Sequence, residues 1–156
     1  MIDAHFHAWA LGRGDYAWLT SALAPIYRDV QVSDWLVQAE PHGMQGGVLV
    51  QAAPTAAETD YLLGLAREHA SVLGVVGWVD MLATDAVAQV ERLALQPKLK
   101  GLRPMLQDLP DPDWILQPAL TPVLDAMARC GLVFDALMVP VHLPRMATLI
   151  ERHPDL

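Results

Sequence analysis

The chain begins with MIDAHFHAW (residues 1–9), a stretch with the alternating pattern of a β-strand. Successive side chains of a strand point to opposite faces, so we expect Asp3, His5 and His7 on one face and three apolar residues on the other. Two imidazoles placed two residues apart on a strand can bind one metal ion. The pattern is short, and a strand with two partly exposed histidines is the alternative interpretation.

Four more apolar segments follow at residues 48–52, 75–80, 99–103 and 132–137, and segments with helical periodicity separate them. This alternation predicts an α/β fold with a parallel sheet covered by helices. The sheet can close as a TIM barrel or stay open as a doubly wound sheet. No Gly-x-Gly-x-x-Gly motif follows any predicted strand, so the nucleotide-binding form of the open sheet loses its main support.

Capping residues mark the ends of the predicted helices. Ser33 and Thr84 are expected to be N-caps, and Thr55 with Glu58 has the spacing of a capping box. Gly131 follows the predicted helix that begins near residue 121, where a C-terminal glycine is common.

The composition narrows the class of protein. A length of 156 residues with 53% hydrophobic residues fits one domain with a sizeable core. A formal net charge of −8 argues against binding to nucleic acid or to an anionic membrane surface. One cysteine, Cys130, and the lack of a signal peptide or a long apolar run predict a cytoplasmic protein outside the membrane.

Polar residues stand at the end of every predicted strand. Since the carboxyl ends of parallel strands carry the chemistry of α/β folds, we expect these side chains to converge on one site. A helix cap, a turn or a surface salt bridge is the alternative for each one alone. A guanidinium at such a position suits a carboxylate or a lactone carbonyl. The residues are His5 and His7, Gln51, Asp80, Arg103 and Asp135.

A long irregular stretch, residues 11–32, follows the first strand and carries Tyr16, Trp18 and Tyr27. Long loops of this kind are often functional. We expect it either to cover a substrate at the His-x-His end or to pack its aromatic residues against the domain.

Several of these motifs together resemble the sugar-lactonase branch of the amidohydrolase superfamily. The resemblance implies a TIM (β/α)8 barrel that hydrolyses a sugar lactone such as L-fucono- or L-rhamnono-lactone. The matching motifs are DAHFHAW (3–9), VQA (50–52), ETDYLL (58–63), GVVGWVD (74–80), KGLR (100–103) and FD (134–135).

The same resemblance implies roles for particular residues. His5, His7 and Arg103 are expected to be catalytic, with His5 and His7 as ligands of a divalent metal, zinc before others. Some related lactonases work without a metal. Substrate contacts are expected from Trp9, Gln51, Trp78, Asp80, Arg103 and Asp135.

A full barrel needs roughly 250 residues. The resemblance therefore implies that residues 1–156 form a single domain with about the first five βα units, ending before the sixth strand. A third histidine and a catalytic aspartate are expected on later strands, so we expect no activity from these residues alone. The open edges favour self-association. The alternatives are a catalytically silent partial barrel that associates with another chain, and another metal-dependent amidohydrolase.

Overall fold

The computed structural model describes all of residues 1–156. Its sheet has five parallel strands in the order β1-β2-β3-β4-β5, so each strand lies beside the one that precedes it in the chain. This is the arrangement of the first five βα units of a TIM barrel and confirms the predicted fold class. The strands are β1 (Ile2–Phe6), β2 (Gly46–Val50), β3 (Val72–Gly77), β4 (Leu99–Leu102) and β5 (Val133–Phe134).

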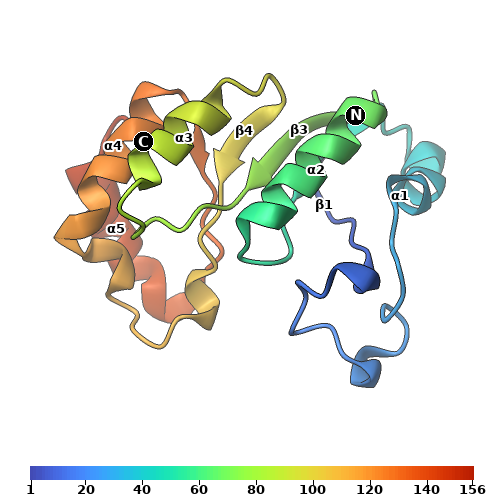
Figure 1. Cartoon of the computed structure of the whole chain (residues 1–156), viewed down its shortest axis with the longest axis horizontal. Coiled ribbons are helices and arrows are strands. Elements are labelled where there is room, and N and C mark those ends of the chain that lie inside the picture. Colours follow the sequence, from blue (N-terminus) through green and yellow to red (C-terminus); the bar gives the residue numbers. More distant parts are fainter.

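Five α-helices accompany the strands. Figure 1 shows α2 in front of the sheet, α1 beyond the β1 end, and α3, α4 and α5 together at the other end. No helix combines the length and the apolar character needed to cross a membrane. The helices are α1 (Val32–Ala39), α2 (Ala56–Glu68), α3 (Ala86–Ala94), α4 (Thr121–Arg129) and α5 (Leu143–Arg152).

The main core lies between the sheet and these helices. It contains 26 buried residues, including Phe6, Leu49, Val75 and Leu102 from four neighbouring strands. Burial of this apolar surface is the main force that holds the helices on the sheet. The strands are thereby fixed side by side, and the residues that follow them meet at one edge of the sheet.

Two of the predicted N-caps are wrong. Helix α1 begins at Val32, one residue before Ser33, because the Asp34 carboxylate accepts a hydrogen bond of 2.7 Å from the backbone N–H of Gln31. Helix α3 begins at Ala86, after Thr84. Gly131 is confirmed as a C-terminal glycine: it has a φ of 66° and donates its N–H to the Ala128 carbonyl.

The first strand departs from the expected alternation. The register of β1 against β2 shifts between Asp3 and Phe6. The Trp35 ring of α1 stacks on Phe6 at 4.1 Å, and its indole N–H donates to the Asp3 carboxylate at 2.8 Å. Asp3 and Phe6 therefore contact the same helix, and the prediction that Asp3 accompanies His5 and His7 is wrong.

The sheet has two open edges. Ile2 on β1 and Val133 on β5 are each 60% exposed. Strand β5 is shorter than the predicted segment 132–137, and an isolated bridge between Met105 and Leu137 extends its pairing with the β4 side.

Candidate functional site

The two histidines of the opening motif meet at the end of β1. Their Nε2 atoms lie 3.0 Å apart, and their rings pack edge to face. The Nδ1 atom of His7 lies 2.7 Å from the Val50 carbonyl oxygen, which can only accept a hydrogen bond. The proton of a neutral His7 is therefore on Nδ1, and its Nε2 lone pair faces His5.

Burial keeps both imidazoles neutral near pH 7. It lowers the pKa of His7 to about 4, against a weaker raising effect from the hydrogen bond to Val50. The pKa of His5 is also lowered, first by burial and then by the positive charge of Arg103. Neutral imidazoles are the form that binds a cation.

Arg103 follows β4 directly and is only 3% exposed. Its Nη2 donates to the backbone carbonyl of Gln51, and its Nη1 lies 3.3 Å from His5 Nε2. Burial lowers the pKa of the guanidinium. Its Nε has no hydrogen-bond partner, so the group retains a donor inside the protein.

Gln51, the residue after β2, binds the backbone of Arg103 with its side chain, just as Arg103 binds the backbone of Gln51. Its amide donates from Nε2 to the Arg103 backbone carbonyl at 2.8 Å, and the whole residue is buried. The two residues thus fix each other, while the Gln51 Oε1 atom stays without a partner.

Asp135 follows β5 and is partly buried. The pKa values of His5, His7 and Arg103 are all lowered by burial, and the negative charge of Asp135 opposes this lowering in each of them. No ion pair joins it to Arg103, and its charge reaches the site through space. The structure therefore brings four predicted residues into contact, His5, His7, Gln51 and Arg103, and Asp135 acts on them by its charge.

A cavity of about 350 Å³ opens beside this group. His5, His7 and Arg103 supply its polar wall. The sequence pattern did not indicate Met105, Gln107, Asp108 and Leu137 as lining residues, because their place at the cavity depends on the fold. The remaining lining residues are Trp18, Ala52, Met105, Gln107, Asp108 and Leu137.

Trp9, a predicted substrate contact, does not line this cavity. It is buried in a small apolar cluster with Tyr16 and Leu19, and its indole N–H donates to the Arg28 carbonyl at 2.7 Å. Trp18 lines the cavity and is 42% exposed. The 11–32 loop therefore packs aromatic residues against the domain, as one of the two expectations had it, and Trp18 from this loop lines the cavity.

Trp78 and Asp80 also lie outside this cavity. They line a neighbouring one of about 390 Å³, which shares Met105 and Asp108 with the first. The Asp80 carboxylate accepts a hydrogen bond from the backbone N–H of Leu82, as an ordinary turn residue does.

Glu58 was predicted only as half of a capping box, and that prediction is half right. The Thr55 hydroxyl accepts the Glu58 N–H at 3.0 Å, as a capping box requires. The Glu58 carboxylate turns instead to the backbone N–H groups of Ala52 and Ala53, directly after Gln51. The complete burial of Glu58, which only the fold reveals, distinguishes it from an ordinary helix-capping glutamate.

The ring nitrogens of His5 and His7 are the candidate ligands for a metal ion. Since the proton of neutral His7 is on Nδ1, its Nε2 lone pair is free to bind a cation, and His5 Nε2 lies 3.0 Å from it. The pair fits a zinc ion as two of its ligands. The structure has no group of three or more His, Cys, Asp or Glu side chains that could hold a metal ion.

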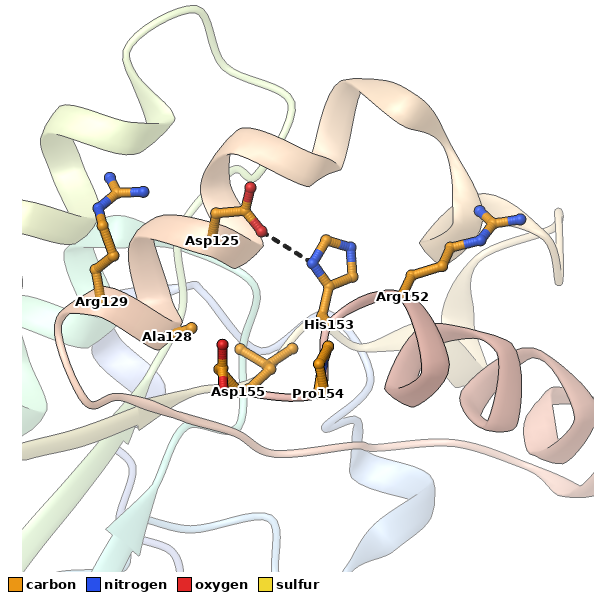
Figure 2. Close-up of a pocket in the computed structure, with 8 residues that line it drawn as sticks. Asp125, Ala128, Arg129, Arg152, His153, Pro154 and Asp155 are labelled. Atoms are coloured by element: carbon orange, nitrogen blue, oxygen red, sulfur yellow. Dashed lines mark hydrogen bonds and ion pairs between the residues drawn. The ribbon is translucent and has the colours of Figure 1, made fainter.

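A further cavity of about 490 Å³ lies between α4 and the end of α5. Figure 2 shows His153 directed at Asp125, with a 3.0 Å contact between Nδ1 and Oδ1. Arg129 and Arg152 flank it. Since His153 is engaged by Asp125 and no strand end opens here, this cavity is not the candidate site.

Comparisons with known proteins identify relatives of this chain. An L-fucono-1,5-lactonase from Burkholderia ambifaria is 46% identical over 99% of this chain and 53% of its own length. An L-fucono-1,5-lactonase from Burkholderia multivorans is 28% identical over 97% of this chain and 51% of its own length. The chain thus spans about half the length of the curated relatives it matches.

A crystal structure of an amidohydrolase from Burkholderia multivorans with bound zinc has the same fold. It superposes with a TM-score of 0.89 at 28% identity, over 99% of this chain and 54% of that one. The family model described as Amidohydrolase (Amidohydro_2) matches residues 2–156. The chain therefore belongs to the amidohydrolase family.

Proposed function

We propose that this chain forms the metal- and carbonyl-binding wall of a hydrolase that opens a sugar-derived lactone to its aldonic acid. The observation that carries the proposal is the convergence of His5, His7 and Arg103 on one cavity. Neutral imidazoles beside a buried guanidinium suit the binding of a cation together with a carbonyl oxygen. The similarity to two L-fucono-1,5-lactonases supports a lactone as the substrate.

Each residue has a role that follows from its contacts. The His7 ring is oriented by the Val50 carbonyl, so that its Nε2 and that of His5 face one point and would hold a divalent metal. A bound metal would polarise the carbonyl and acidify water. The Arg103 guanidinium would stabilise the negative charge that develops on the carbonyl oxygen when water adds, before the ring C–O bond breaks and the ring oxygen leaves as a hydroxyl.

Other side chains would bind the sugar. The exposed ring of Trp18 offers an apolar surface to the C–H groups of a sugar ring. Asp135 follows β5 at the same end of the sheet as Arg103, and we retain it as a proposed substrate contact for hydroxyl groups. Gln51 acts by holding Arg103.

Hydrolysis of L-fucono-1,5-lactone, followed with a pH indicator in the presence of Zn²⁺, tests the proposal. Arg103→Met should abolish the catalysed rate. Lys100→Met is the matched control, because Lys100 is an exposed cation in β4, the strand that Arg103 directly follows. The assay is run on the chain alone and on the chain mixed with the part of the Burkholderia ambifaria lactonase that it does not cover. The proposal would be refuted if neither the chain alone nor the mixture hydrolysed the lactone. It would also be refuted if Arg103→Met and Lys100→Met had equal rates.

A second candidate is a catalytically silent domain that associates with another chain. The exposed Ile2 and Val133 on the two edge strands favour it. Sedimentation of the wild type and of the Ile2→Lys and Val133→Lys variants distinguishes the two. Association without hydrolysis, lost in either variant, would favour this candidate over the first.

A further inference from the structure

Glu58 is a buried carboxylate with no cation bound to it. It has no exposed surface and appears in no ion pair. Burial raises its pKa, against the lowering effect of the hydrogen bonds that it accepts. A glutamate that only caps a helix can stay in water, so its burial calls for a role that an exposed glutamate could not fill.

The carboxylate holds two successive peptide units at the end of β2. It accepts hydrogen bonds from the backbone N–H groups of Ala52, at 3.1 Å, and Ala53. The N–H of Ala52 belongs to the peptide unit that also contains the Gln51 carbonyl. The N–H of Ala53 belongs to the unit that contains the Ala52 carbonyl. Because each unit is planar, fixing its N–H also fixes the direction of its carbonyl.

Both of these carbonyls hold residues that line the cavity. The Gln51 carbonyl accepts from the Arg103 guanidinium, and the Ala52 carbonyl accepts from the Trp18 indole N–H at 2.7 Å. Trp18 and Arg103 come from parts of the chain 85 residues apart, yet both are bound through the two peptide units that Glu58 holds. Hydrogen bonds in series polarise one another, so the anion also makes both carbonyls stronger acceptors.

We infer that Glu58 is a positioning residue, which sets Trp18 and Arg103 at the cavity through the peptide units 51–52 and 52–53. Its effect on lactone binding rests on the proposed function. Its effect on the two side chains does not. Glu58→Gln keeps the size of the side chain but directs an amide N–H at one of the two backbone donors, so one of the two peptide units loses its acceptor.

The test is hydrogen exchange at the Trp18 indole N–H and the Arg103 guanidinium, read from ¹⁵N-edited NMR spectra and assigned with Trp18→Phe and Arg103→Met. In Glu58→Gln one peptide unit loses a hydrogen bond to a charged group, so exchange should quicken by up to roughly 10-fold to 100-fold at the side chain which that unit holds: Trp18 if Ala53 loses its acceptor, or the Arg103 guanidinium if Ala52 does. The Trp114 indole should change by less than twofold. Asp60→Asn is the matched control, because it removes the same charge from an exposed position on the same helix.

Unchanged exchange at both the Trp18 indole and the Arg103 guanidinium in a folded Glu58→Gln protein would overturn the inference, and so would an equal change in Asp60→Asn. If Glu58→Gln does not fold, the wild type decides: the amides of Ala52 and Ala53 should exchange slowly, and exchange at the rate of an open loop would overturn it. These readouts need no lactone. Altered exchange at Trp18 in a protein without lactone hydrolysis would uphold the positioning role and refute only the proposed function.

Discussion

Gly101 provides a sharp test of the pairing between β4 and β5, on which the position of Asp135 depends. A Cβ atom at Gly101 would lie 2.5 Å from the carbonyl oxygen of Val133 and 3.2 Å from its carbonyl carbon. Ordinary contact begins at 3.4 Å, and the obstacle is backbone, which cannot rotate away as a side chain can. Gly101→Ala must therefore push the two strands apart by about 1 Å.

We expect Gly101→Ala to lower the free energy of unfolding by about 1–3 kcal/mol, the usual cost of forcing extra volume into a packed site. The matched control is Gly64→Ala in α2, where the nearest atom to a new Cβ is 3.8 Å away. An alanine inside a helix should instead raise stability by about 0.5–1 kcal/mol. The same chemical change thus has opposite signs at the two positions.

Urea unfolding followed by far-UV circular dichroism measures both variants under the same conditions. The slopes of the two transitions should match that of the wild type, so that the midpoints report stability alone. A Gly101→Ala protein as stable as the wild type would refute the close pairing of β5 with β4.

Three further predictions concern the site. Between pH 4 and 6.5 the unfolded chain binds more protons than the folded one, because burial lowers the pKa of His7 to about 4. The free energy of unfolding of the metal-free protein should therefore rise with pH across this range, by up to about 3 kcal/mol. Urea titrations at several pH values measure this change, and the profile of the His7→Gln variant should be flatter. Thr59→Val should lower the free energy of unfolding by roughly 2–4 kcal/mol in the same assay, since the Thr59 hydroxyl both donates to and accepts from the Trp78 backbone. Thr20→Val, at an exposed position, is the control. A Thr59→Val protein as stable as this control would contradict the two hydrogen bonds. Zn²⁺ should raise the unfolding midpoint of the wild type but not of His5→Ala, measured by thermal unfolding with and without chelator.

Much of the fold was predictable because its signals are local. A short apolar segment bounded by turn residues predicts a buried strand wherever it lies, and all five predicted strands are present. The helix starts at Val32 and Ala86 were missed by a residue or two, since several neighbouring polar side chains could each act as the cap. Asp3 was misplaced because the register shift in β1 depends on β2 and on Trp35.

The sequence by itself determined that His5, His7, Gln51, Arg103 and Asp135 stand at strand ends, because burial and alternation are properties of each short segment. Only the tertiary structure decided which of the polar strand-end residues meet, and it left Trp78 and Asp80 at a different cavity. It also gave Glu58 its place behind the site. The physical reason is distance along the chain: the hydrogen bonds that orient His7 and Arg103 join residues 43 and 52 positions apart, and no local pattern encodes such a pairing.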